Sequence, residues 1–261
     1  MKHYKKFIVF AFFYIIMSVH SAKAQDYAGE AATMEPAMLV DKPTAGMLKR
    51  GGYIAGFNMY ERGGVLFNIS VGVWDPFMFG ISYGGTSIVG NQKVDMNPFP
   101  GVVVKLRIIN ESEELPAIAL GFDSQGRGPY VDGIDRYSIK SPGLFAVVSK
   151  NYTMMGNLSF HGGVNISLER GDGDKDLNIF TGIEKSAGNN VSLMLEYDLG
   201  FNDNHGQALG RFKGRGYLNF GVRWSLTTGW VLGFNMKDLF QNQGSASLGT
   251  RTLQLDYTGV F

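Results

Sequence analysis

The stretch Val65-Leu66-Phe67-Asn68-Ile69-Ser70-Val71-Gly72-Val73 alternates along almost its whole length between large apolar residues and polar or small ones. Successive side chains of a β-strand point to opposite sides, so this pattern predicts a strand with one apolar face and one largely polar face. The same period of two recurs from Gly51 to the C-terminus in segments of about ten residues. We find no long stretch with the helical period of 3.6 residues.

The repeated alternation predicts an all-β fold, a transmembrane antiparallel up-and-down β-barrel formed by residues 51–261. We expect 12 strands; ten or 14 would follow if one hairpin has been split or fused. The predicted strands are 51–61, 64–75, 77–86, 101–110, 115–123, 143–151, 156–169, 176–186, 190–200, 215–226, 229–239 and 250–261.

The connections between these strands alternate in length, which distinguishes a membrane barrel from a soluble sandwich. If the last strand ends in the periplasm, the periplasmic connections are short, as at Asp75-Pro76 and Thr227-Thr228. The connections on the other side are longer, as at residues 85–100 and 124–142, and only the hairpin near Arg62 departs from this rule. Short periplasmic turns and longer outer loops are typical of bacterial outer-membrane barrels.

One face of the predicted strands is aliphatic and aromatic, and the other carries Gly, Ser, Asn and charged residues. In a membrane barrel the apolar face contacts lipid and the polar face lines the lumen. The predicted lumen charges are Lys105, Arg107, Glu184, Glu196, Asp198, Arg223, Lys237 and Asp256. They could line a conduction path, or they could neutralise one another in a narrow, filled lumen, because buried charges without partners are costly.

The first 24 residues have the features of a secretory signal peptide. Lys2, Lys5 and Lys6 precede an apolar run at residues 7–19, and small residues at Ala22 and Ala24 fit a cleavage site. The run of 13 residues is short for a helical membrane anchor, which needs about 20. We therefore expect Sec export, cleavage after Ala24 and a periplasmic N-terminal segment at residues 25–50, with a short plug as the alternative.

The C-terminal stretch, residues 253–261, alternates and ends in Phe261 on the apolar face. It resembles the signal that outer-membrane barrels present to the barrel-assembly machinery. Expected partners are therefore that machinery, outer-membrane lipid and, in one hypothesis, a polysaccharide, with the cell outer membrane as the location.

Composition excludes several other classes of function. Without the signal peptide, 20 Lys and Arg face 23 Asp and Glu, a net charge of −3, so a nucleic-acid partner is not expected. The chain has no cysteine, which excludes disulfides, thiolate metal sites and a lipoprotein anchor. We expect no cofactor and no metal.

Residues 105–202 contain motifs that resemble the YjbH-like family of outer-membrane proteins, which is associated with exopolysaccharide production. The motifs are Leu115-Pro116-Ala117-Ile118-Ala119-Leu120-Gly121-Phe122-Asp123, Gly126-Arg127-Gly128, Ser149-Lys150, Phe180-Thr181-Gly182-Ile183-Glu184 and Leu195-Glu196-Tyr197-Asp198. The resemblance implies an outer-membrane β-barrel and a link to surface polysaccharide. It implies no reaction and no catalytic residue, and the chain is short for the family.

Three smaller features each have two interpretations. The carboxylates of Asp172, Asp174 and Asp176 could bind calcium, but the EF-hand pattern is incomplete, so we expect a solvated acidic loop. Ser159 and His161 share a face and could form a hydrolytic pair, yet a hydrogen-bonded lumen histidine is the simpler interpretation. The loop at residues 124–142 offers contact candidates, which could bind carbohydrate or protein, or fold inward and close the barrel. These candidates are Arg127, Tyr130, Arg136 and Tyr137.

The sequence therefore leads to three functional hypotheses. The first is a non-enzymatic outer-membrane barrel that serves exopolysaccharide export or envelope structure. The second is a small, porin-like diffusion or ion channel. The third, and the least supported, is an outer-membrane lipid hydrolase.

Overall fold

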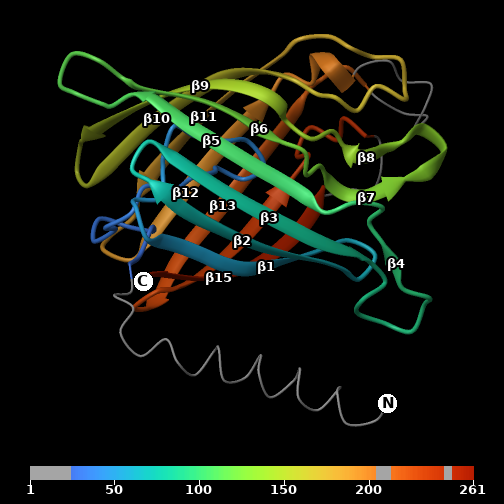
Figure 1. Cartoon of the computed structure of the whole chain (residues 1–261), viewed down its shortest axis with the longest axis horizontal. Helices are drawn as coiled ribbons and strands as arrows, with labels where there is room; N and C mark the ends of the chain where they lie inside the picture. The colour runs from blue at the N-terminus through green and yellow to red at the C-terminus, as the bar shows by residue number, and fades with distance from the viewer. Residues whose placement is uncertain (1–24, 204–212, 244–248) are drawn as a thin grey trace.

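A computed structural model describes residues 25–203, 213–243 and 249–261, and in it the chain forms a closed β-barrel (Figure 1). Strand β1 (Gly52–Tyr60) pairs with β2 on one side and with the last strand, β15 (Thr250–Val260), on the other. Every pairing between neighbouring barrel strands is antiparallel. The pairing of β2 with β3 completes the ring of 12 strands, which confirms the predicted fold class and strand count.

The observed strand bounds agree with the predicted ones to within three residues, because the period of two extends over the full length of each strand. The other ten barrel strands are β2 (Gly64–Trp74), β3 (Phe77–Thr86), β5 (Gly101–Ile109), β6 (Ala117–Asp123), β9 (Gly143–Thr153), β10 (Asn157–Ile166), β11 (Asn178–Ser186), β12 (Val191–Asp198), β13 (Tyr217–Thr227) and β14 (Trp230–Lys237).

Short elements lie within the longer connections. Strand β4 (Asp95–Met96) pairs with the end of β3. Strands β7 (Arg127–Val131) and β8 (Arg136–Ile139) form a separate hairpin around the 3-10 turn η1 (Asp132–Ile134); we call residues 127–139 the cap hairpin. A second 3-10 turn, η2, spans Phe201–Asp203. None of these elements has enough residues to show a period in the sequence.

The two ends of the barrel differ in the length of their connections. One end, the short-turn end, carries tight connections such as residues 75–76 and 228–229, together with the start of β1 and the end of β15. The other, the long-loop end, carries the cap hairpin and β4 (Figure 1). The proposed signal peptide, residues 1–24, lies outside the described residues.

The apolar face of the strands points outward and the polar face points inward, as the alternation predicts. Phe67 and Trp224 are 56% and 50% exposed, whereas Glu196 and Asn235 are fully buried. Exposed aromatic side chains of Trp74, Tyr152 and Trp230 lie near the short-turn end, where tryptophan and tyrosine typically meet a membrane–water interface. Among the described residues, no helix is long and apolar enough to cross a membrane.

Candidate functional site: the barrel lumen and the segment inside it

Residues 25–50 lie within the barrel and hydrogen-bond to its inward-facing side chains. The segment runs without regular structure, apart from one bridge between Met38 and Pro43. Near its start, Gly29 N–H donates to Ser192 Oγ at 3.0 Å and Ser225 Oγ–H donates to the Ala28 carbonyl at 3.2 Å. The segment therefore occupies the lumen, and we call it the lumen segment.

The turn at Met38–Pro43 is fixed to β12 through one carboxylate. The backbone N–H groups of Val40, Asp41 and Lys42 all donate to Oε2 of Glu196, at 3.0, 2.8 and 2.8 Å. Successive N–H groups that converge in a turn form a concave site for an anionic oxygen. Oε1 of Glu196 accepts from Asn219 Nδ2 at 2.8 Å, so both oxygens of this fully buried carboxylate are satisfied.

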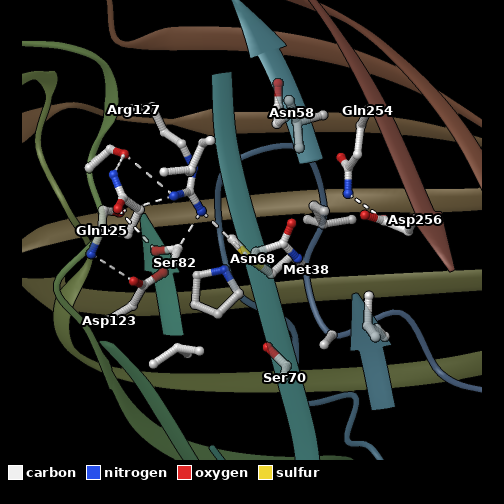
Figure 2. A pocket seen from close by; sticks show the side chains of 18 of the residues that line it. Met38, Asn58, Asn68, Ser70, Ser82, Asp123, Gln125, Arg127, Gln254 and Asp256 are labelled. Atoms are coloured by element: carbon white, nitrogen blue, oxygen red, sulfur yellow. Dashed lines mark hydrogen bonds and ion pairs between the residues drawn. The ribbon is translucent and has the colours of Figure 1, made fainter. Parts of the chain in front are cut away.

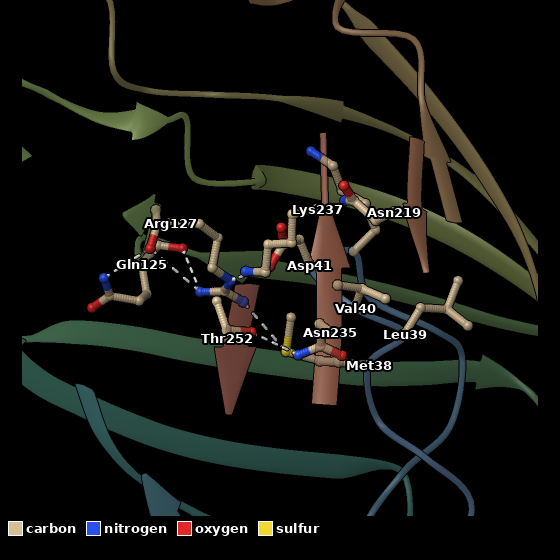
Figure 3. A network of polar contacts seen from close by, with 12 residues as sticks. Met38, Leu39, Val40, Asp41, Gln125, Arg127, Asn219, Asn235, Lys237 and Thr252 are labelled. Carbon is tan, nitrogen blue, oxygen red and sulfur yellow. Dashed lines mark hydrogen bonds and ion pairs between the residues drawn. The ribbon is translucent and has the colours of Figure 1, made fainter. Parts of the chain in front are cut away.

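The side chains of the same turn form buried ion pairs with the barrel wall. Asp41 Oδ1 lies 2.6 Å from Lys237 Nζ and 3.3 Å from Arg127 Nε (Figure 3). Lys42 Nζ lies 2.7 Å from Asp198 Oδ2. Each of these charges is removed from water, so each depends on its partner for compensation.

Side chains of strand β5 bind the residues on both sides of the turn at Met38–Pro43. Lys105 Nζ donates to the carbonyls of Ala37 and Thr44 at 2.8 and 3.0 Å. Arg107 donates from Nη2 to the Ala45 carbonyl at 2.7 Å and forms an ion pair with Glu35. These two cations thus bind backbone oxygens that have no partner in a strand or helix.

The eight predicted lumen charges lie on the inner face, and their close contacts are mostly not with one another. Within the described residues, no ion pair joins two of the eight. Seven of them bind the lumen segment instead; Arg223 donates to the Leu39 carbonyl and Asp256 accepts from the Tyr27 hydroxyl. Glu184, the eighth, is also buried, and its carboxylate hydrogen-bonds to the Ser192 side chain of β12. Charges on opposite sides of the barrel cannot reach one another, because the lumen segment lies between them.

A buried apolar cluster lies inside the barrel near the short-turn end. It consists of Tyr27, Ala28, Met34, Met47, Leu48, Met78 and Val231, and we call it the apolar seal. Met78 and Val231 are the second residues of β3 and β14, both of which start at the short-turn end. The other members belong to the lumen segment, so wall and segment together make the seal.

A cavity of about 170 Å³ remains beside the lumen segment (Figure 2). Strands β1, β2 and β3 form one side of its wall, the turn at Met38–Pro43 forms another, and β5, β6, β9 and β13–β15 contribute the remaining barrel-strand residues. A smaller cavity, of about 20 Å³, shares four lining residues with it: Tyr60, Arg127, Gly128 and Lys237. These residues lie at the long-loop end, so the space extends toward that end and stops at the apolar seal.

The predicted pair of Ser159 and His161 does not form. Ser159 Oγ–H donates to Asn151 Oδ1 at 2.5 Å, and the partner of His161 Nδ1 is Ser149 Oγ at 2.7 Å. The Ser149 hydroxyl also accepts from Ala45 N–H of the lumen segment at 2.8 Å. Ser149 and His161 are therefore buried beneath the lumen segment, and the geometry does not support a hydrolytic site at Ser159 and His161.

The acidic loop is not solvated as expected. The Asp172 side chain is 3% exposed, and its two oxygens bind Arg136 and Lys140 at 2.6 and 2.8 Å. Asp174 is also buried, and only Asp176 is exposed. In the described part of the chain, no group of three or more histidines or carboxylates could hold a metal ion.

The four predicted contact residues of the outer loop belong to the cap hairpin and mostly point inward. Arg127 reaches Asp41 in the lumen, and Arg136 is fully buried between Asp172 and Asp203, at 2.6 Å from each. Tyr137 is buried and packs edge-on against Tyr130, with ring centroids 5.1 Å apart. The hairpin therefore covers the barrel mouth more than it offers a surface.

Glu169 helps to hold the cap hairpin in place. Its carboxylate accepts the backbone N–H groups of Tyr137 and Ser141 at 2.8 and 2.9 Å. Burial raises the pKa of Glu169 above its ordinary value, although these hydrogen bonds act in the opposite direction. On another side, Gln243 Nε2–H donates to the Ser138 carbonyl at 2.9 Å. The hairpin is thus tied to the connections on both sides of the mouth.

Sequence reasoning missed the partners of the lumen charges, above all Asp41 and Lys42. No periodicity marks residues 25–50, and most of their bonds use backbone atoms, which leave no trace in the residue types. The polar residues Asn58 and Gln254 of the cavity were missed too. Their positions on the polar face of their strands were the available signal.

A closed antiparallel barrel with an apolar exterior and a polar, filled interior defines a membrane-spanning β-barrel. No family model matches the chain, and no curated protein matches it. The resemblance to the YjbH-like family therefore finds no support in these comparisons.

Among solved structures, the chain is similar to several outer-membrane barrels. One is the KdgM porin, with 10% identity and a TM-score of 0.48, covering 80% of this chain and 99% of that one. The KdgM porin in complex with disordered oligogalacturonate is 10% identical, with a TM-score of 0.47, and the match covers 80% of this chain and 99% of that one. The Acinetobacter baumannii outer membrane protein Omp33 is 10% identical, with a TM-score of 0.45, and the match covers 82% of this chain and 99% of that one.

Proposed function

We propose that this protein is a small, non-enzymatic outer-membrane channel for polar solutes, and that the lumen segment keeps it closed. The observation that carries the proposal is the pairing of the wall charges with the segment rather than with each other. A barrel built only as a filled scaffold needs no counter-charges on a separate segment. A polar wall that is compensated by a removable segment suits a pore.

The contacts of the segment are of a kind that water can replace. Glu196, Lys105 and Arg107 bind backbone N–H and C=O groups, and water satisfies both types of group. The segment joins β1 directly, so it can leave the lumen while its end stays attached to the wall. The apolar seal is the main barrier to the passage of ions in the closed state, because it excludes water.

The outer membrane is the location that fits the outward apolar face and the exposed aromatic residues at the short-turn end. The side chain of Phe261 is 78% exposed at the end of β15, where the assembly machinery could bind it. Export with cleavage after Ala24 would leave Gln25 at the start of the mature chain.

A disulfide between the segment and the wall tests the proposal. The chain has no cysteine, so Ala45→Cys and Ser149→Cys create a single pair, at positions where backbone N and Oγ now lie 2.8 Å apart. We expect planar bilayers to show current steps with the reduced protein and none with the oxidised protein. The two single-cysteine variants serve as controls. Currents that are equal in both states, or absent in both, would contradict the proposal.

The YjbH-like resemblance supports a second role, in exopolysaccharide export or envelope structure. That role rests on the motifs at residues 105–202 alone. Deletion of the gene, followed by measurement of secreted polysaccharide, tests it separately from conductance. An unchanged polysaccharide yield would remove this alternative.

A further inference from the structure

The lumen segment binds one side of the barrel and leaves the other side with free polar groups. Its side-chain hydrogen bonds and ion pairs to barrel strands go to β5, β9, β10 and β12–β15. Among the described residues, none goes to a lumen side chain of β1 or β2. The 170 Å³ cavity lies along these two strands.

The polar side chains that the segment does not contact form a strip on β1, β2 and β3, in which Ser82 Oγ–H donates to Gln125 Oε1 at 3.0 Å. In the strand register, Asn68 lies opposite Gly56 on one side and opposite Ser82 on the other. Ser70 follows two residues later on the same face, and Asn58 precedes Tyr60 in the same way. Figure 2 shows Asn58, Asn68, Ser70 and Ser82 along the wall of the cavity.

Two atoms of this strip, and one atom of β15 beside it, have no hydrogen-bond partner within the described protein. The Asn58 Oδ1 atom and the Tyr60 hydroxyl are buried without a hydrogen bond, and so is Oδ1 of Asp256. Buried polar atoms are nearly always satisfied, so unpartnered ones need a reason. Three such atoms on residues that line one cavity indicate a ligand.

The charged residues of the cavity are already engaged, and this determines the charge of the ligand. Arg127 pairs with Asp41 and Asp123, and Lys237 pairs with Asp41. Asp256 accepts from Tyr27 and from Gln254 through Oδ2. What remains for a ligand is mainly neutral: amides and hydroxyls, which donate and accept hydrogen bonds.

Part of the cavity wall is apolar, and the cavity volume limits the size of the ligand. Ile54, Leu66 and Met78 line it beside the polar strip. An apolar cavity of about 150 Å³ holds a molecule the size of benzene, so 170 Å³ accommodates one six-membered ring. A molecule with many hydroxyl groups and C–H faces matches both parts of the wall.

From this geometry we propose that the cavity beside the lumen segment binds a neutral, hydroxyl-rich ring molecule, with the dimensions and chemistry of one monosaccharide. It enters from the long-loop end, through the space shared by Tyr60, Gly128 and Lys237. Binding requires no movement of the lumen segment. It therefore stands apart from the proposed function, and a channel that never opens would still bind the ligand.

The test uses the full mature chain, folded in an amine-oxide detergent, because maltoside detergents carry sugar headgroups that would compete. Saturation-transfer NMR and calorimetric titration with D-glucose measure binding. We expect saturable binding, and a loss of affinity of about tenfold or more in Asn68→Leu and Asn58→Leu, which keep the side-chain volume but remove the amide. Asn91→Leu, in an exposed loop, is the matched control and should bind like the wild type.

The outcomes separate the alternatives. Wild-type protein that gives no saturable signal with D-glucose, or equal affinity in the wild type and both cavity variants, would overturn the proposal. Tighter binding of D-glucuronate than of D-glucose would also overturn it, because it would show that Arg127 and Lys237 remain available to an anion. The shift in gel mobility of the unheated protein reports whether each variant is folded, and the two cavity variants are independent of each other.

Discussion

Lys42 of the lumen segment and Asp198 of β12 form an ion pair, with Nζ and Oδ2 2.7 Å apart and both side chains 4% exposed. Breaking a buried pair on one side leaves an uncompensated charge and costs about 3–5 kcal/mol. In an Ala45→Cys background, where the new thiol is covered, we expect Lys42→Met to increase the rate of maleimide labelling at least a hundredfold. The double variant Lys42→Met/Asp198→Asn removes the stranded charge and should recover most of the protection; if it labels as fast as the single variant, the ion pair does not hold the segment.

The Glu196 carboxylate provides a second test, because a glutamine cannot replace it. Glutamine has one acceptor oxygen, so either the three N–H groups of the turn or Asn219 would lose their partner. An unsatisfied buried group costs about 1–3 kcal/mol. We expect Glu196→Gln to speed labelling at the same thiol about tenfold or more. Glu184→Gln, also in the lumen wall, is the control and should change the rate less than twofold; similar effects of the two would show that the turn is held elsewhere.

Gly182 leaves room for the lumen segment, which makes it sensitive to size. A Cβ added at Gly182 would lie 2.4 Å from Leu39 Cδ1 and 2.8 Å from the Leu195 carbonyl oxygen of β12, whereas a Cβ at Gly162 meets only the Phe180 carbonyl oxygen, 3.8 Å away. We expect Gly182→Val to raise the open probability of single channels in planar bilayers. Gly162→Val introduces the same residue into a neighbouring strand and should leave it unchanged. Indistinguishable recordings from the two variants would count against a role of segment docking in closure.

Arg136 determines how firmly the cap hairpin covers the mouth. Its Nη1 atom serves Asp172 and Asp203 together, and both carboxylates are buried. Arg136→Met should therefore loosen residues 127–139, which hydrogen–deuterium exchange would detect as faster amide exchange there. Arg170→Met removes an exposed arginine from an adjacent connection and serves as the control. Equal exchange in both variants would mean that Glu169 and Gln243 suffice to hold the hairpin.

The barrel itself was predictable because each strand carries its own signal. Phe67 and Asn68 are adjacent in the sequence and differ in environment, and the same contrast is clearest in β11, β12 and β13. The inner face was predictable for the same reason, as Glu196 and Asp256 show. The partners of these charges were not predictable, because alternation assigns a residue to one face of the sheet but does not identify the residues that contact it.

The lumen segment and the cap hairpin could not be derived from residue patterns, for two different physical reasons. The segment is bound through backbone groups such as Val40 N–H and the Ala45 carbonyl, which every residue possesses. The hairpin depends on pairings between distant connections, as between Arg136 and Asp203, and such charges look solvated in sequence. The sequence therefore left both interpretations of residues 124–142 open, a contact surface or a loop that closes the barrel.

The seam between β1 and β15 has a consequence for the order of assembly. Gly51, directly after the lumen segment, accepts the backbone N–H of Phe261, so the first and last strands meet where the segment enters. Translation delivers β15 last, and contacts between chain ends form slowly because a long loop must close. Residues 25–50 can thus dock while the barrel is still an open sheet, and closure of the seam then encloses them. Biogenesis would then produce the barrel already loaded, without any later step of threading.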